Sequence, residues 1–205
     1  MSPAPAVGSA NRDAHSVRTN GTTTVLSCGI IGAGIAGLAA AIALRRAGHN
    51  VEIFEKSTFK NEIGAAVTLT PNAMRVLHRW GFDAVRAGTT EKEQYRRLDA
   101  ETLQVLAHYD FSNVREKFGT PGREHAFAAF HRVDLHEGLR AMVRELGVEV
   151  QLGREAVRVD CGEGVVRFRD GGEAKKDLLV VADGIKVSDS PSSHCDTQVE
   201  TPLHQ

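Results

Sequence analysis

The amino-acid sequence predicts an α/β fold with a Rossmann-like βαβ core. An apolar run at 25–31 has the length of a buried strand, and GAGIAG at 32–37 follows it in the spacing GxGxxG. A helix with an apolar stripe then breaks near Gly48, and a second strand at 51–55 ends in Glu55. A strand, a glycine turn, a helix and an acidic strand end in this order are typical of a dinucleotide-binding unit.

Each glycine of the turn has a physical reason. Gly32 permits the tight turn, Gly34 leaves room for a pyrophosphate, and Gly37 lets the helix pack against the strand. The helix N-terminus offers free N–H groups and a positive dipole end to phosphates. Glu55, 18 residues after Gly37, is placed to accept hydrogen bonds from ribose hydroxyls. It would repel a 2′-phosphate, so NADP fits this site poorly.

Residues 25–44 also allow a different interpretation, a membrane span. They carry no charge and are long enough to cross a bilayer, and their small residues would suit helix packing in a membrane. The charged strand end at Glu55 favours strand, turn and helix instead, because a membrane span rarely has such an end at this spacing. We therefore expect no stable membrane insertion.

The composition indicates a globular chain without affinity for nucleic acid. Of 205 residues, 41% are apolar and 25% charged, and the net charge is −1. Three cysteines lie far apart without CxxC spacing: Cys28, Cys161 and Cys195. This argues against a zinc site or a disulfide framework and favours a reducing compartment, the cytoplasm. Three histidines do not share one helical face: His125, His131 and His136. We expect them to be solvated or locally bonded, and we expect no metal site.

The middle of the chain predicts a helix, a hairpin and a strand–helix unit. The helix begins after Thr70, has Pro71 at its first position, and stops at Gly81. Two alternating runs within 94–111 flank a turn and predict the hairpin. A strand and a helix follow within 126–147, where apolar residues recur at helical spacing.

The last patterned part of the chain predicts short strands. Three of them, 148–153, 156–160 and 165–170, are separated by loops and turns, and a buried strand at 177–184 follows. Arg132 lies just before the helix predicted within 126–147, in an otherwise apolar segment, and requires an anionic partner. The residues alone favour a local salt bridge, for example to Asp134.

Four segments together resemble a known family. GxGxxG with Glu55, then GAAVTLTPNAMRVL, HRVDL and LLVVADGIK, in this order, resemble the FAD-dependent aromatic hydroxylases, flavoprotein monooxygenases of the salicylate hydroxylase type. More narrowly, they are similar to fungal members that modify secondary metabolites. The resemblance covers about 25–186. It implies a Rossmann-like FAD-binding βαβ core with an incomplete β-rich substrate-domain portion, including the hairpin near 94–108.

The resemblance also implies a cofactor, a reaction and a site. FAD would be the cofactor, NAD(P)H the reductant, and an aromatic or polyketide-like small molecule the substrate that is hydroxylated with O₂. Eight residues would contact FAD: Gly32, Gly34, Gly37, Glu55, Ala66, Arg132, Asp183 and Gly184. The three glycines of the turn would hold the pyrophosphate, and Glu55 would bind the ribose. Ala66 would lie against the flavin. A tight loop between two packed elements is the competing explanation of the stretch Gly64-Ala65-Ala66. The Asp-Gly pair would serve both FAD and the approach of the nicotinamide. No catalytic side chain is implied.

The two ends of the chain lack this pattern. Residues 1–24 are small and polar without an apolar core, so we expect a disordered leader and no secretory signal. Residues 187–205 have no usable period. Val187-Ser188 is what an in-frame splice donor would encode, and we interpret the tail as read-through of a retained intron. A frameshift, a short isoform and a genuine small protein are the alternatives.

Three functions follow from these observations. The first is the FAD-binding portion of a flavin-dependent monooxygenase. The second is a truncated, non-catalytic product with weak or no FAD binding. Its flavin pocket would lack a wall, and its hairpin would lack most of its partner strands. The third is an NAD-dependent dehydrogenase, against which HRVDL and ADG argue. The sequence predicts neither the substrate nor the oligomeric state.

Overall fold

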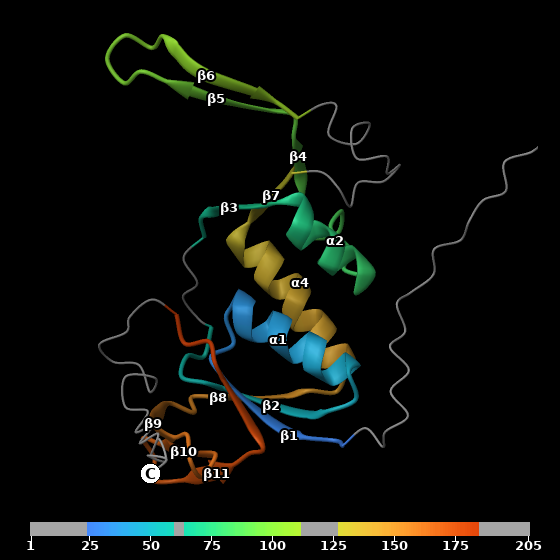
Figure 1. Cartoon of the computed structure of the whole chain (residues 1–205), viewed down its shortest axis with the longest axis vertical. Helices are drawn as coiled ribbons and strands as arrows, with labels where there is room; N and C mark the ends of the chain where they lie inside the picture. The colour runs from blue at the N-terminus through green and yellow to red at the C-terminus, as the bar shows by residue number, and fades with distance from the viewer. Residues whose placement is uncertain (1–23, 60–63, 112–126, 185–205) are drawn as a thin grey trace, which may run out of the picture.

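A computed structural model describes residues 24–59, 64–111 and 127–184, and its core is a parallel sheet (Figure 1). The sheet has the order β12-β1-β2-β8, and every pairing in it is parallel. Its strands are β1 (Ser27–Ile31), β2 (Asn50–Glu55), β8 (Glu149–Leu152) and β12 (Leu178–Val181). The predicted α/β class is confirmed. The predicted leader, the tail from 187, His125 and Cys195 lie outside the described residues.

The apolar segment at the start of the unit forms a strand, a turn and a helix. After β1, α1 (Ile35–Arg46) follows its N-cap residue Gly34 and buries Leu38, Ala41 and Ile42 against the sheet. It ends before Gly48, whose φ of +94° is accessible to glycine. Within the described ranges, no helix is long and apolar enough to cross a membrane.

α1 packs on one face of the sheet, and two further helices lie behind it. α4 (Arg132–Glu145) packs against α1, and α2 (Pro71–Arg79) lies beyond α4 in Figure 1. Their buried side chains join those of the sheet in one apolar cluster, which includes Ile30, Ile53, Leu38, Leu135 and Leu139. This cluster fixes the start of α4 beside the glycine turn.

A small antiparallel sheet covers the other face. It has the order β11-β10-β9, from β9 (Ala156–Asp160), β10 (Val165–Phe168) and β11 (Glu173–Lys175). Phe168 meets Phe54 of the parallel sheet with ring centroids 4.8 Å apart. Of the strands predicted after 148, β8 joins the parallel sheet rather than this one, and β11 was not predicted.

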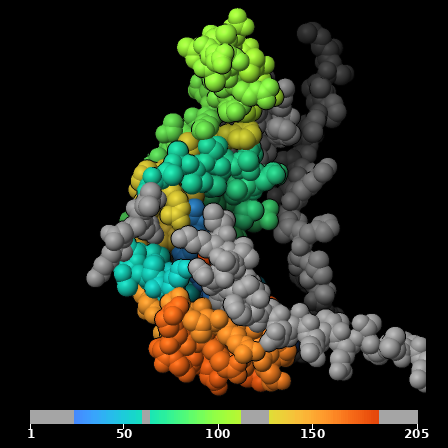
Figure 2. All heavy atoms as spheres, turned by 90° about the vertical axis from the view of Figure 1, so that its left-hand side faces the viewer, coloured from blue at the N-terminus to red at the C-terminus, as the bar shows by residue number. Residues whose placement is uncertain are grey.

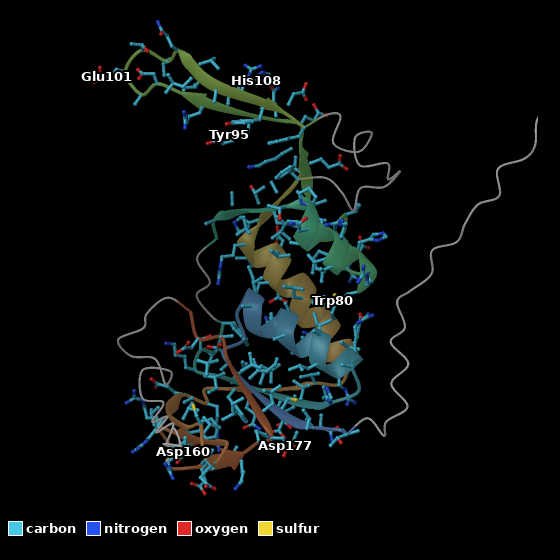
Figure 3. All side chains as sticks on the ribbon, viewed as in Figure 1. Trp80, Tyr95, Glu101, His108, Asp160 and Asp177 are labelled. Atoms are coloured by element: carbon cyan, nitrogen blue, oxygen red, sulfur yellow. The ribbon has the colours of Figure 1, made fainter. Side chains whose placement is uncertain are left out.

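A third sheet leads to the hairpin. Its order is β3-β7-β4, from β3 (Ala66–Leu69), β7 (Phe127–His131) and β4 (Thr90–Lys92). The predicted hairpin is present as β5 (Gln94–Leu98) and β6 (Val105–Asp110), which pair with each other. It stands clear of the body at the end opposite β9–β11 (Figure 2), and Tyr95, Glu101 and His108 project from it (Figure 3). Within the described residues, neither strand has a second partner strand.

Candidate functional site

A cavity of about 210 Å³ lies at the carboxyl ends of β1, β2 and β12, where open α/β sheets bind ligands. Six of the eight predicted site residues line it: Gly32, Gly34, Glu55, Arg132, Asp183 and Gly184. They come from three strand ends and the first turn of α4. The fold therefore brings together residues that lie up to about 150 positions apart in the chain.

The three glycines of the turn differ in what surrounds them. Gly32 has φ +97°, and an added Cβ would lie 2.5 Å from the Ala182 carbonyl oxygen. A Cβ on Gly37 would lie 1.9 Å from the Gly32 carbonyl oxygen, whereas no atom lies within 4 Å of one on Gly34. Gly32 and Gly37 thus serve the tight turn and the close helix packing. The open side of Gly34 lies on the cavity, where a phosphate could approach the backbone.

The Glu55 carboxylate lies at the end of β2 and is only 8% exposed. Its Oε2 accepts a hydrogen bond from the Ala33 N–H at 2.7 Å, and its Oε1 accepts one from the Ser57 N–H at 2.7 Å. Each carboxylate oxygen has a second lone pair. The group can therefore hold the turn and still accept hydrogen bonds from a ligand hydroxyl.

Arg132 is the first residue of α4 and lines the cavity. Its backbone N–H donates to the Ala65 carbonyl oxygen at 2.9 Å, which ties α4 to the segment before β3. No ion pair between Arg132 and Asp134 occurs among the described side chains. The local salt bridge expected from the residues alone is therefore wrong, and the guanidinium is available to an anionic ligand.

Two of the eight predicted residues lie outside the cavity lining. Gly37 is buried beneath the turn, in accord with its packing role. Ala66 is the exposed first residue of β3 and pairs with His131. Asp183 and Gly184 follow β12 after Ala182, and Gly184 has φ +99° with no atom within 4 Å of an added Cβ. The described residues thus gather the turn, Glu55, Arg132 and the Asp-Gly pair, but not Ala66.

Sequence reasoning missed the residues that follow β8. Arg154 lines the cavity, stacks on the Phe168 ring at 4.3 Å from its centroid, and donates to Asp170 at 2.9 Å. At the rim, Arg169 forms two hydrogen bonds with Glu155, of 2.5 and 2.8 Å. These bonds lower the pKa of the Glu155 carboxyl. No local sequence signal identifies Arg154 or Glu155 as site residues. The loop after β8 that carries them reaches the cavity because β8 pairs with β2.

Two expectations about titratable residues were wrong. His136 is not solvated: it is 1% exposed, and its Nε2 lies 2.7 Å from the Ala33 carbonyl oxygen, 103 positions away. Cys161 is disulfide-bonded, although the cysteine spacing predicted no disulfide framework. Cys28 is a free, buried thiol. In the described part of the chain no group of side chains could hold a metal ion.

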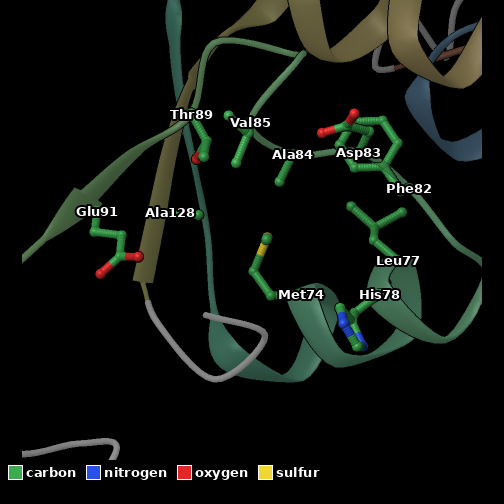
Figure 4. A pocket seen from close by; sticks show the side chains of 10 residues that line it. All are labelled: Met74, Leu77, His78, Phe82, Asp83, Ala84, Val85, Thr89, Glu91 and Ala128. Carbon is green, nitrogen blue, oxygen red and sulfur yellow. The ribbon is translucent and has the colours of Figure 1, made fainter. Parts of the chain in front are cut away.

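A second cavity, of about 200 Å³, lies beside α2 (Figure 4). Met74, Leu77 and Phe82 contribute to a mainly apolar lining. None of the predicted site residues reaches it. The cavity at the strand ends is therefore the one that combines anion-binding backbone, a carboxylate and an arginine.

Known proteins are similar to this chain in sequence and in fold. A family model described as FAD binding domain matches residues 22–197. The FAD-dependent monooxygenase OpS4 of Beauveria bassiana is 36% identical over 160 residues, which are 76% of this chain and 36% of that protein. The crystal structure of 2-methyl-3-hydroxypyridine-5-carboxylic acid oxygenase (mutant Y270A) matches with a TM-score of 0.66 and 29% identity, over 79% of this chain and 40% of that one. Klebsiella pneumoniae HpxO complexed with FAD and uric acid matches with a TM-score of 0.61 and 28% identity, over 80% of this chain and 40% of that one. The chain thus spans about two fifths of the length of these proteins.

Proposed function

This chain belongs to the FAD binding domain family, and we propose that it is the FAD-binding portion of a flavin-dependent monooxygenase. The substrate would be an aromatic or polyketide-like small molecule. The observation that carries the proposal is the open side of Gly34, which faces a cavity shared with Glu55 and Arg132. An NAD-dependent dehydrogenase is disfavoured, because the family match extends through the HRVDL and ADG segments.

We propose the following roles for the cavity residues. The first N–H groups of α1 and the backbone at Gly34 would donate to the pyrophosphate. Glu55 would accept from the ribose hydroxyls, and Arg132, Asp183 and Gly184 would contact other parts of the cofactor. Ala66 would lie against the flavin, beyond the part of the site that the cavity lining defines. FAD, when bound, supplies redox chemistry with O₂, and NAD(P)H would be the reductant.

A second candidate function concerns the chain as it stands. We propose that it binds FAD weakly, does not retain it through purification, and does not hydroxylate a substrate. Large apolar side chains of the hairpin are exposed, including Tyr95 (51%), Leu106 (56%) and Tyr109 (54%), and two paired strands alone are marginal in water. β12 likewise has one partner strand in the described sheet.

We also propose that residues 187–205 are read-through of a retained intron. The family match runs to residue 197, which counts against this proposal. Sequencing of cDNA across the codons of Lys186 to Ser188 tests it. Messages that continue into a longer reading frame would support it, and a single message encoding the tail as written would refute it.

We propose the cytoplasm as the compartment. NAD(P)H is supplied there, and Cys28 is a free thiol. The disulfide at Cys161 is the observation that argues against it. A fluorescent fusion of the whole chain, imaged in its own cell type, decides between the cytoplasm and an oxidising compartment.

The function is tested by titrating the purified chain with FAD. We expect quenching of flavin fluorescence with a weak dissociation constant, competition by ADP, and no effect of NAD⁺ at equal concentration. Product analysis with NADH or NADPH and aromatic acids should show no hydroxylated product. Absence of any FAD binding would refute the first candidate, and substrate-dependent NAD(P)H oxidation coupled to product would refute the second.

A further inference from the structure

Two buried polar side chains of the described residues bind the same residue of the turn. Among the described residues, Glu55 and His136 are the only buried polar or charged ones, with 8% and 1% exposure. Glu55 Oε2 accepts from the Ala33 N–H at 2.7 Å, and His136 Nε2 lies 2.7 Å from the Ala33 carbonyl oxygen. Ala33 itself is fully buried. Its two backbone polar groups are thus held from two different elements, β2 and α4.

The partner of His136 fixes the position of one proton. A carbonyl oxygen only accepts hydrogen bonds, so His136 Nε2 must carry a hydrogen and donate it to Ala33. This holds for the neutral Nε2–H tautomer and for the imidazolium. The Nδ1–H neutral tautomer would place two acceptors 2.7 Å apart, and the structure excludes it on that ground.

His136 lies on a face of α4 that is otherwise apolar. The other buried residues of this helix are Leu135, Leu139 and Val143. Phe59 contacts the imidazole edge-to-face, with centroids 5.1 Å apart, and the Arg140 guanidinium covers the Phe59 ring at 4.5 Å. A buried imidazole at such a position is unfavourable unless it is hydrogen-bonded. The bond from Nε2 to the Ala33 carbonyl oxygen meets this requirement for that nitrogen.

The bond to Ala33 determines the direction of the next N–H group. A trans peptide is planar, and its C=O and N–H point in opposite directions. No cis peptide occurs in the described residues. With the Ala33 carbonyl oxygen held toward His136, the Gly34 N–H points away from α4. Gly34 lines the cavity and His136 does not.

The same reasoning explains the preceding peptide. The Ala33 N–H is held toward Glu55, so the Gly32 carbonyl oxygen points the opposite way. That oxygen is the atom nearest to a Cβ placed on Gly37. Glu55 and His136 therefore orient two successive peptide planes of the turn, one toward the helix and one toward the cavity.

We propose that His136 is a positioning residue of the FAD site, which holds the Gly34 N–H toward the pyrophosphate. The proposal rests on the proposed function, because the anion that Gly34 would meet belongs to FAD. His136 itself does not touch the cofactor and acts through Ala33. Its loss should weaken FAD binding about tenfold, the effect of misdirecting one hydrogen bond to a charged group.

The test uses the whole chain and three variants. His136→Leu keeps an apolar side chain of similar reach and removes the donor, and His136→Gln retains an N–H donor. Leu139→Ala, on the same buried face of α4, is the control for a general loss of packing. Thermal unfolding followed by circular dichroism selects a temperature at which all four proteins are folded, and FAD fluorescence titrations are made there.

We expect FAD binding about tenfold weaker in His136→Leu, within about threefold in His136→Gln, and unchanged in Leu139→Ala. Equal FAD affinity of His136→Leu and the unsubstituted chain would overturn the proposal. Equal weakening in Leu139→Ala would also overturn it, because the effect would then be structural.

A second readout does not depend on FAD. Long-range ¹H–¹⁵N spectra of the chain without cofactor should show His136 protonated at Nε2, and the Gly34 amide resonance should shift in His136→Leu but not in Leu139→Ala. A neutral Nδ1–H tautomer would refute the hydrogen bond and with it the proposal. If the unsubstituted chain binds no FAD but His136 is protonated at Nε2 and Gly34 shifts, the proposed function fails while the orientation of the turn by His136 stands.

Discussion

Replacing Gly34 or Gly37 by alanine separates two functions of the turn. Gly34 faces the cavity proposed for the cofactor, and Gly37 packs α1 against the turn. At Gly37 the new carbon would lie 1.9 Å from the Gly32 carbonyl oxygen, and at Gly34 no atom lies within 4 Å. The backbone of Gly34, with φ −72° and ψ −178°, is extended and accessible to alanine. Gly34→Ala therefore changes only the surface that faces the cavity, whereas Gly37→Ala forces the helix and the turn apart.

The expected free energies of unfolding differ accordingly. Real Cβ contacts essentially never fall below 3.0 Å, so Gly37→Ala requires α1 to move by about 1 Å or more. Overpacking of this kind costs about 1–3 kcal/mol, and we expect about 3 kcal/mol because Leu38 and Ile42 beside it are fully buried. For Gly34→Ala, the weaker N-cap costs about 0.5–1 kcal/mol. The lower entropy of the unfolded chain returns about 0.4–1 kcal/mol, so the net change is below about 0.5 kcal/mol.

Two assays separate the variants. Urea unfolding gives the stability, and FAD fluorescence gives the affinity, for which Gly34→Ala should lose at least about tenfold, or about 1.4 kcal/mol. Gly162→Ala, in an exposed turn where the nearest atom to a Cβ is 3.6 Å away, is the matched control and should change neither. The reasoning fails if Gly34→Ala binds FAD like the unsubstituted chain, or if it is as unstable as Gly37→Ala.

Four further predictions concern other contacts. Glu55→Gln leaves one of two backbone N–H groups without an acceptor and should lower the free energy of unfolding by about 1–3 kcal/mol in urea; an unchanged midpoint would contradict this. Burial raises the pKa of the Cys28 thiol, so iodoacetamide at pH 8 should label Cys28 only after unfolding, and rapid labelling of the folded chain would refute it. The Arg169 hydrogen bonds lower the pKa of Glu155, so the stability from this pair is present above the ordinary glutamate pKa and is lost as pH falls through the lowered value. Glu155→Gln should flatten that acid limb of the stability curve, and an identical pH profile would argue against the pair. Limited proteolysis should cut first in the turn of the hairpin 94–110, whose side chains are largely exposed; first cleavage within α4 would contradict this.

Local sequence signals predicted the elements that are determined locally. The GxGxxG spacing and the acid at Glu55 gave β1, the turn, α1 and β2, since each of these forms within about thirty residues. The ends of α2 were predicted to within two residues from Thr70, Pro71 and Gly81. Alternation and turn residues identified the hairpin. Where a cap, a period or a turn residue specifies an element, the sequence alone was sufficient.

The elements that were missed depend on distant partners. β3 (Ala66–Leu69) and β4 (Thr90–Lys92) are short, and among the described strands both pair only with β7. β4 reads Thr-Glu-Lys, a polar triplet with no strand signal of its own. β8 was predicted as a strand, but its place in the parallel sheet was not, because that place depends on its pairing with β2, 97 positions earlier. No window of a dozen residues contains that information, so Arg154, which follows β8 into the cavity, could not be predicted either.

The least expected part of the site is Ala33, an unspecified position of the glycine pattern. Sequence reasoning assigned roles to the three glycines, because their missing side chains have an obvious steric purpose. The constraint on Ala33 acts instead on its backbone N–H and carbonyl groups, which any residue possesses. Arg132 and His136 lie four positions apart on α4 and so share a face, with one at the cavity and the other at the turn. The segment HRVDLH thus serves the site twice. Its arginine offers charge to a ligand, and its second histidine directs a backbone N–H toward the same place.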